Sequence, residues 1–126
     1  MKSILVKTND TFQIVDSDNL RSLVNGYVEV VRPTAGYTDK LLLRENVFVC
    51  DEEGLCKEKE TNYFGTLLYN GLFGPKQLYP IAGNIVIIGM DREDFRSLTN
   101  EEVDYYNKIL KLLRFKEVGE LNSSII

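Results

Sequence analysis

The stretch that decides the fold is Ile81-Ala82-Gly83-Asn84-Ile85-Val86-Ile87-Ile88-Gly89, the most apolar run of the chain. A continuous run of β-branched residues, unlike an alternating one, is typical of a strand that is buried on both faces. A helix is disfavoured because residues 85–88 crowd the helical side-chain rotamers and the flanking glycines leave too little length for three turns. We therefore expect residues 84–90 to form the central strand of a sheet.

Length and charge limit the classes of protein that this chain can belong to. It has 126 residues, 44% of them hydrophobic, which suits a single domain that buries roughly two-thirds of its unfolded surface. Nineteen acidic residues against fifteen basic ones give a formal net charge of -4. Such a chain lacks the basic surface that neutralises phosphates, so we expect no nucleic-acid partner.

The amino terminus gives no indication of a membrane segment, because its first apolar stretch, residues 4–6, ends at Lys7. We therefore expect a cytoplasmic protein with no membrane partner and with both cysteines reduced. No cofactor is indicated by any motif, and the sequence leaves the oligomeric state open.

The rest of the chain predicts short elements that cover the central strand. Turn residues between apolar segments indicate strands, and N-cap residues ahead of apolar residues three and four apart indicate helices. The expected elements are a hairpin at 3–7 and 12–15, a helix at 20–24, a strand at 27–32, apolar segments at 41–43 and 47–50, and a helix from 63 that ends at Asn70-Gly71. We expect one α+β domain over residues 1–116, with a mainly antiparallel sheet, two short helices, one longer C-terminal helix packed on a face, and a frayed tail over 117–126.

The longer helix is expected to follow Thr99. Thr99 and Glu102 have the spacing of a capping box, and Leu98 and Val103 have that of a hydrophobic staple. The apolar residues that follow form one stripe, which consists of Val103, Tyr106, Ile109, Leu110 and Leu113. Basic residues gather near the carboxyl end, where the helix dipole favours cations, so this cluster needs no partner to explain it.

Residues 51–54, Asp-Glu-Glu-Gly, predict a tight turn, because aspartate suits its first position and glycine its left-handed position. If this turn closes a hairpin, Leu55 and Cys56 begin the return strand, and Cys50 lies opposite Cys56. We then expect two adjacent, reduced thiols on one face of the sheet, since the cytoplasm keeps thiols reduced and so short a loop gains little from a disulfide.

Few residues are available for catalysis. The chain has no histidine, which removes the commonest general base and transition-metal ligand at neutral pH, and two cysteines alone are too few for a structural zinc site. Carboxylates remain, and residues 51–53 are the one feature that indicates a metal-dependent hydrolase. A solvated turn explains the same cluster, and Lys57 and Lys59 stand where a calcium loop needs further oxygen ligands.

Four blocks of sequence together resemble a known family. They are Leu23-Val24-Asn25-Gly26-Tyr27-Val28-Glu29-Val30-Val31, Val49-Cys50-Asp51-Glu52-Glu53-Gly54, Asn62 ahead of a small helix, and Ile81-Ala82-Gly83-Asn84-Ile85-Val86-Ile87. In order and spacing they resemble domain-of-unknown-function family 3846. The family pattern has a proline where this chain has Glu60-Thr61, and an aspartate in place of Asn84. The resemblance implies a small accessory protein of a phage, plasmid or conjugative element, and it implies no catalytic residues.

Two classes of function remain open. The first is a non-enzymatic binding protein of a phage or mobile element, which inhibits a host protein or sequesters a small molecule such as a nucleotide signal. The second is a small hydrolase that uses carboxylates and a metal ion.

The candidate binding residues are Tyr27, Glu29, Asn62, Tyr63 and Phe73. We expect Glu29 and Asn62 to reach one pocket lined by Tyr27 or Tyr63, because both stand in blocks that carry the resemblance and a lone carboxylate is costly in an apolar strand. The structural alternative is that the aromatic rings belong to the core and that Glu29 faces solvent on an edge strand.

Overall fold

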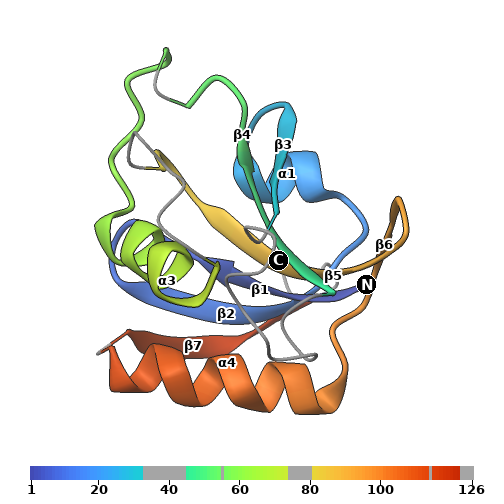
Figure 1. Cartoon of the computed structure of the whole chain (residues 1–126). Coiled ribbons are helices and arrows are strands. Elements are labelled where there is room, and N and C mark those ends of the chain that lie inside the picture. Colours follow the sequence, from blue (N-terminus) through green and yellow to red (C-terminus); the bar gives the residue numbers. More distant parts are fainter. Residues whose placement is uncertain (33–44, 55, 74–80, 114, 123–126) are drawn as a thin grey trace.

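The computed structural model describes residues 1–32, 45–54, 56–73, 81–113 and 115–122, and these form one seven-stranded sheet with helices on both faces (Figure 1). The strand order is β3-β4-β5-β1-β2-β7, with β6 paired to β5 beside this path. The elements are β1 (Lys2–Val6), β2 (Thr11–Asp16), α1 (Leu20–Val24), β3 (Val28–Val31), β4 (Asn46–Asp51), α3 (Tyr63–Phe73), β5 (Ile85–Asp91), β6 (Asp94–Arg96), α4 (Asn100–Leu112) and β7 (Lys116–Asn122). The predicted α+β class and the mainly antiparallel sheet are confirmed.

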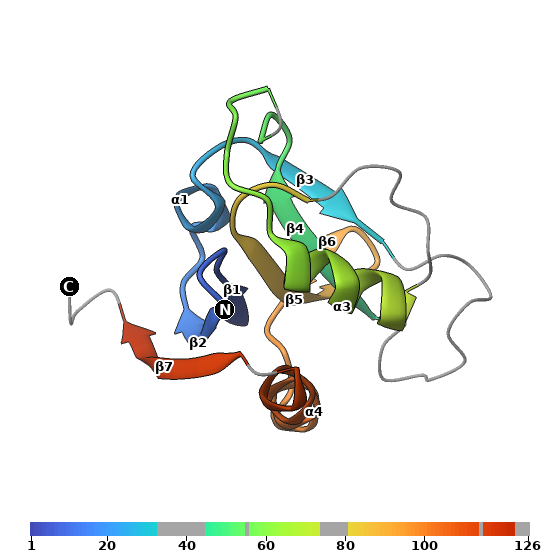
Figure 2. The same ribbon diagram turned by 90° about the vertical axis from the view of Figure 1, so that its left-hand side faces the viewer.

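Strand β5 is the central strand that the sequence predicts. It pairs antiparallel with β1 on one side and with β4 on the other. Ile85 and Ile87 belong to the core cluster under α3 and α4, whereas Val86 and Ile88 belong to the cluster under α1, and all four are 0% exposed. Figure 2 shows the helices on opposite faces of the sheet, which is the covering that a strand buried on both faces requires.

The predicted amino-terminal hairpin and the first helix are present. Strands β1 and β2 pair antiparallel, from Lys2 opposite Asp16 to Val6 opposite Phe12. Helix α1 begins after the N-cap residue Asn19, whose side chain accepts a hydrogen bond from the Ser22 N–H, and it ends at Asn25.

Helix α3 is longer than the sequence predicts, because it continues past Asn70-Gly71 to Phe73. Leu68 and Tyr69 are buried in the core, and burial of an apolar face stabilises a helix more than one glycine weakens it. The apolar segment expected at residues 41–43 lies outside the described residues.

The prediction of a frayed tail from residue 117 is wrong for residues 117–122, because β7 pairs parallel with β2. The Lys116 N–H donates to the carbonyl oxygen of Asp10, and buried Phe115 anchors the start of the strand. An edge strand needs few apolar residues when its backbone hydrogen bonds supply the pairing, so its composition resembles that of a tail. The folded domain therefore extends to Asn122, and residues 123–126 lie outside the described part of the chain.

The capping box of α4 is present as predicted. Thr99 Oγ1 accepts a hydrogen bond of 3.1 Å from the Glu102 N–H, and Glu102 Oε1 accepts one of 2.8 Å from the Thr99 N–H. Tyr106 and Leu110 are fully buried, and Val103 and Ile109 pack against the same cluster. Leu113 is 38% exposed, so the apolar stripe ends one turn earlier than the sequence indicates.

Glu102 also anchors a buried polar network that joins α4 to the sheet. Its two oxygens accept hydrogen bonds of 2.8 and 3.1 Å from the Arg96 guanidinium, and Oε2 accepts a further one from Asn46 Nδ2. Asn46 Oδ1 in turn accepts a bond of 2.8 Å from the Tyr106 hydroxyl. Arg96 lies directly over Gly89, where a Cβ atom would come within 2.4 Å of the guanidinium.

The network keeps Glu102 charged although the side chain is buried. Burial, the strongest single influence, raises the pKa of Glu102, but the hydrogen bonds from Arg96, the Thr99 N–H and Asn46 together outweigh it and leave the pKa lowered. A buried charge needs such partners. Glu102 of the capping box and Arg96 of β6 therefore depend on one another.

The predicted register of the two cysteines is wrong. The turn itself is present, because the Gly54 N–H donates to the carbonyl oxygen of Asp51 over 3.1 Å. Cys50, however, pairs with Glu29 of β3, which occupies the edge of β4 that a return strand at Cys56 would need. Cys50 is buried and Cys56 is exposed, and burial, with the nearby carboxylates, raises the pKa of Cys50 to about 12.

We predict that Leu110→Ala lowers the free energy of unfolding by about 2 to 5 kcal/mol, because it leaves a cavity under α4. Leu112→Ala is the matched control in the same helix, since Leu112 is 81% exposed, and it should change stability by less than about 0.5 kcal/mol. Urea unfolding followed by circular dichroism measures both. Equal losses in the two variants would show that α4 does not pack on the sheet through this residue.

Candidate binding site

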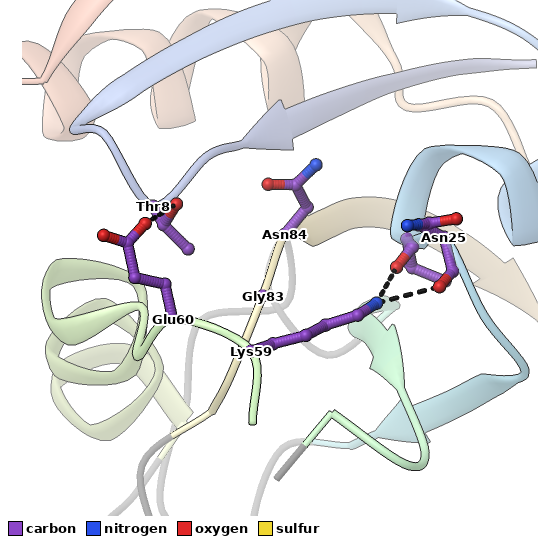
Figure 3. A pocket seen from close by; sticks show the side chains of 7 residues that line it. Thr8, Asn25, Lys59, Glu60, Gly83 and Asn84 are labelled. Atoms are coloured by element: carbon purple, nitrogen blue, oxygen red, sulfur yellow. Dashed lines mark hydrogen bonds between the residues drawn. The ribbon is translucent and has the colours of Figure 1, made fainter. Parts of the chain in front are cut away.

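A pocket of about 250 Å³ opens where α1 ends, β1 ends and β5 begins (Figure 3). Its described lining consists of Thr8, Val24, Asn25, Lys59, Glu60, Gly83 and Asn84. These residues come from four separate parts of the chain, and the local reason for each position can be traced.

The wall from α1 depends on a left-handed residue. Asn25 has φ 55° and ψ 54°, a conformation that asparagine tolerates better than most residues and that ends the helix. The following Gly26 N–H donates to the carbonyl oxygen of Arg21, which closes the last turn. This end leaves the carbonyl oxygens of Val24 and Asn25 directed at the pocket, where Lys59 binds them.

Lys59 holds the pocket together through an ion pair with a buried carboxylate. Its Nζ lies 2.6 Å from Asp51 Oδ2, 2.9 Å from the carbonyl oxygen of Val24 and 2.8 Å from that of Asn25. An ammonium group has three N–H donors, so all of them have acceptors here. A cation at this position also stabilises the carboxyl end of α1.

The Asp51 side chain, 1% exposed, is the centre of this arrangement. Besides Lys59 it accepts hydrogen bonds of 3.0 Å from both Lys57 Nζ and the Glu53 N–H. Burial, the strongest single influence, raises the pKa of Asp51, but these three partners outweigh it and lower the pKa to about 2. Gly26 packs against the carboxylate, and a Cβ atom there would lie 2.3 Å from it.

The floor of the pocket is backbone. Gly83 has φ 85°, which strains any residue with a side chain, and a Cβ atom there would lie 3.0 Å from the Lys59 stem. The Gly83 N–H donates to the carbonyl oxygen of Glu60 over 2.7 Å. On either side, Asn84 Nδ2 donates to the carbonyl oxygen of Leu23 over 3.3 Å, and the Thr8 hydroxyl donates to Glu60 Oε2 over 2.9 Å.

Asn62 has a structural role beside the pocket rather than a place in its described lining. Its Nδ2 donates to the carbonyl oxygens of Val6 and Gly83, and its Oδ1 accepts from the Gly65 N–H. The side chain therefore fastens the end of β1 and the start of β5 to the first turn of α3. Asn62 is 2% exposed, and its side-chain amide is used in hydrogen bonds to the backbone.

The other candidate residues from the sequence lie elsewhere. Glu29 is exposed on the edge strand β3, and Tyr63 is 70% exposed on α3. Tyr27 is 55% exposed, with the Arg21 guanidinium 4.7 Å above its ring. Phe73 is the last residue of α3, and its side chain lies outside the described part. Neither Glu29 nor Asn62 is among the described residues that line the pocket, so a site shared by these two stays a prediction.

Four residues that line the pocket, Asn25, Lys59, Gly83 and Asn84, are not among the candidate binding residues that the sequence indicates. Three of them stand in blocks that carry the family resemblance, and this resemblance is the signal that could have identified them as pocket residues. Lys59 had no such signal, because sequence order gives no hint that it reaches back to α1.

The fold and this pocket define a small α+β domain with a preorganised polar site. The chain belongs to the family described as Domain of unknown function (DUF3846), whose model matches residues 1–111. No curated protein and no solved structure matches the chain. Within the described residues, every helix is too short or too polar to cross a membrane.

The blocks that carry the family resemblance meet at this pocket. The first supplies Val24 and Asn25, and the last supplies Gly83 and Asn84. The acidic turn supplies Asp51, which holds Lys59 in the wall. Asn62 of the remaining block supports Gly83 from behind.

We predict that stability falls as the pH is lowered from about 4 to about 2. The folded-state pKa of Asp51 is about 2 and its ordinary value is 3.8, so in this window the unfolded chain binds a proton that the folded chain does not. Asp51→Asn should be less stable at neutral pH and should lose less stability across this window. Urea unfolding at several pH values measures both. Parallel pH profiles for the two proteins would contradict the role of Asp51.

A second prediction concerns the contact between Gly26 and the Asp51 carboxylate. Gly26→Ala should cost about 1 to 3 kcal/mol, because its Cβ atom forces the carboxylate away from the lysines. Gly119→Ala is the matched control, since no atom lies within 4 Å of the added Cβ, and should change stability by less than about 0.5 kcal/mol. Thermal unfolding monitored by circular dichroism measures the difference. Equal melting temperatures for the two variants would be the contrary result.

Proposed function

We propose that the chain is a non-enzymatic binding protein and that the pocket lined by Thr8, Asn25, Lys59, Glu60 and Asn84 is its contact site. One observation carries the proposal. Both ionisable side chains in the described lining already have protein partners, Lys59 in Asp51 and Glu60 in Thr8. The pocket is therefore preorganised for recognition, and neither group is poised to transfer a proton or attack a substrate.

The same contacts favour a binding protein over the alternative, a carboxylate-dependent hydrolase. With a pKa of about 2, Asp51 is ionised at neutral pH, and its oxygens face lysines and a backbone N–H. Glu52 and Glu53, its neighbours in the turn, are exposed. Among the described residues no group of three or more acidic or cysteine side chains could hold a metal ion together.

The setting in a phage, plasmid or conjugative element, and in the cytoplasm of its host, comes from the family resemblance and belongs to the same proposal. The protein would act there by occupying a host protein or by sequestering a small molecule. The small volume of the pocket favours recognition of one small group, either a whole small molecule or one side chain of a larger partner.

We predict that the chain purified from a phage-infected host carries a bound species that native mass spectrometry detects. Thr8→Trp should remove it, because the larger side chain fills the mouth of the pocket. Glu93→Trp, at the exposed turn between β5 and β6, is the control with the same added bulk and should keep it. A wild-type protein without any bound species, or one whose bound species survives Thr8→Trp, would contradict the proposed site.

A further inference from the structure

We infer that a hollow on the outer side of α1 binds a phosphate group through Arg21. This site goes beyond the proposed function, because it shares no described lining residue with the pocket above. Helix α1 buries Leu20 and Val24 and leaves Arg21 and Ser22 exposed. The hollow measures about 380 Å³, and its described lining consists of Asn19, Arg21, Ser22 and Gly26.

Arg21 is held in place by an aromatic ring. The central carbon of its guanidinium lies 4.7 Å from the centroid of the Tyr27 ring, which is the geometry of a cation–π contact. Stacking uses the flat face of a guanidinium and leaves the N–H groups at its edge free to bind two oxygens side by side. Tyr27 therefore orients Arg21 without neutralising its charge.

The Arg21 charge has no carboxylate partner among the residues that the structure describes. Its guanidinium makes no ion pair and no hydrogen bond with them. Arg96 shows the contrast, because its guanidinium binds the carboxylates of Glu102 and Glu45. The N–H groups of Arg21 are therefore available to an anionic ligand, whereas those of Arg96 already have acceptors.

The carboxylates around α1 already have other partners. Asp16 and Asp18 bind the terminal ammonium group of Met1 at 3.2 and 2.6 Å. The Asp51 side chain is buried and binds two lysines. None of these three carboxylates binds Arg21.

Glu29 lies close to Arg21 in sequence but on the other face of the sheet. Its neighbours in β3, Val28 and Val30, pack in the core cluster under α1. Side chains alternate between the two faces of a strand, so Glu29 points away from α1.

Two further hydrogen-bond donors line the hollow. Asn19 Oδ1 accepts a bond of 3.2 Å from the Ser22 N–H, which can only donate, so Nδ2 is the amide atom left for a ligand. The Ser22 hydroxyl makes no hydrogen bond with a described residue. Three donor side chains match the three oxygens of a phosphate group better than the two of a carboxylate.

The net charge of -4 does not prevent the binding of an anion here. At physiological ionic strength, repulsion between exposed charges is largely screened beyond about 8 Å. The charges nearest the ligand therefore decide, and Arg21 is the one ionised side chain in the described lining.

The test is a titration of the whole chain followed by ¹⁵N–¹H correlation spectra. Inorganic phosphate and adenosine 5′-monophosphate are the probes, since a phosphate group can come from the free ion or from a nucleotide. Acetate is the carboxylate control and adenosine is the neutral one. We expect at least one phosphate probe to move the Nε–H signal of Arg21 and the amide signals of Ser22 and Gly26, and adenosine to leave them in place. The phosphate that binds more tightly identifies the source.

Variants decide whether Arg21 carries the binding. Arg21→Gln should weaken it roughly tenfold or more, because the charge and the paired N–H donors are lost. Arg21→Lys keeps the charge without the planar fork, so it should restore only part of the affinity. Lys116→Gln makes the same change in charge on β7, at the edge of the sheet opposite β3, and should weaken binding less than about twofold.

Four results would overturn the inference. They are the absence of any shift with both phosphates, tighter binding of acetate than of either phosphate, adenosine shifts equal to those of adenosine 5′-monophosphate, and equal losses for Arg21→Gln and Lys116→Gln. The proposed function does not depend on these results, because native mass spectrometry of Thr8→Trp tests the separate pocket.

Discussion

The burial of residues 85–90 of β5 on both faces is the constraint on which the rest of the structure depends. A strand with apolar side chains on both faces must have a strand at each edge and a covering layer on each side. Strands β4 and β1 pair with the two edges of β5. Helix α1 covers one face of the sheet, and α3 with α4 covers the other. The remaining strands extend the sheet outward, since β3 pairs with β4, β2 with β1 and β7 with β2.

Two buried carboxylates lie at opposite ends of β4, and each is paired with a cation. Glu102 of α4 binds Asn46 at the start of β4 and Arg96 of β6, whereas Asp51 at the end of β4 binds Lys59. A buried ion pair adds little net stability, because desolvation offsets the attraction, but an unpaired partner is costly. Such pairs therefore penalise wrong arrangements of the chain, and here one positions α4 and the other builds the pocket.

The pocket is held in one arrangement by contacts within the protein. Its charged side chains bind other protein groups, so the binding that we propose would cost little side-chain freedom. The lysine that lines it serves as a support for the end of α1.

The sequence alone predicted the elements whose signals are local. The run of β-branched residues from Ile85 to Ile88 specified a doubly buried strand, and Thr99 with Glu102 specified the start of α4. Both signals act between residues that are near in sequence, so tertiary contacts did not need to be known.

Only the tertiary structure decided what depends on distant partners. The polar strand β7 forms because β2 offers an unpaired edge, and Cys50 pairs with Glu29 because β3 reaches the edge of β4 that the predicted hairpin required. Lys59 lines the pocket because it binds Asp51 and the end of α1 in the folded chain. These partners are distant in sequence, so no periodic pattern of residues predicts the contact. Apolar burial and helix capping depend on the spacing of residues that are near in sequence, so the sequence predicts them. The pairing of strands at sheet edges and the partner of a buried charge depend on distant residues, so only the folded structure decides them.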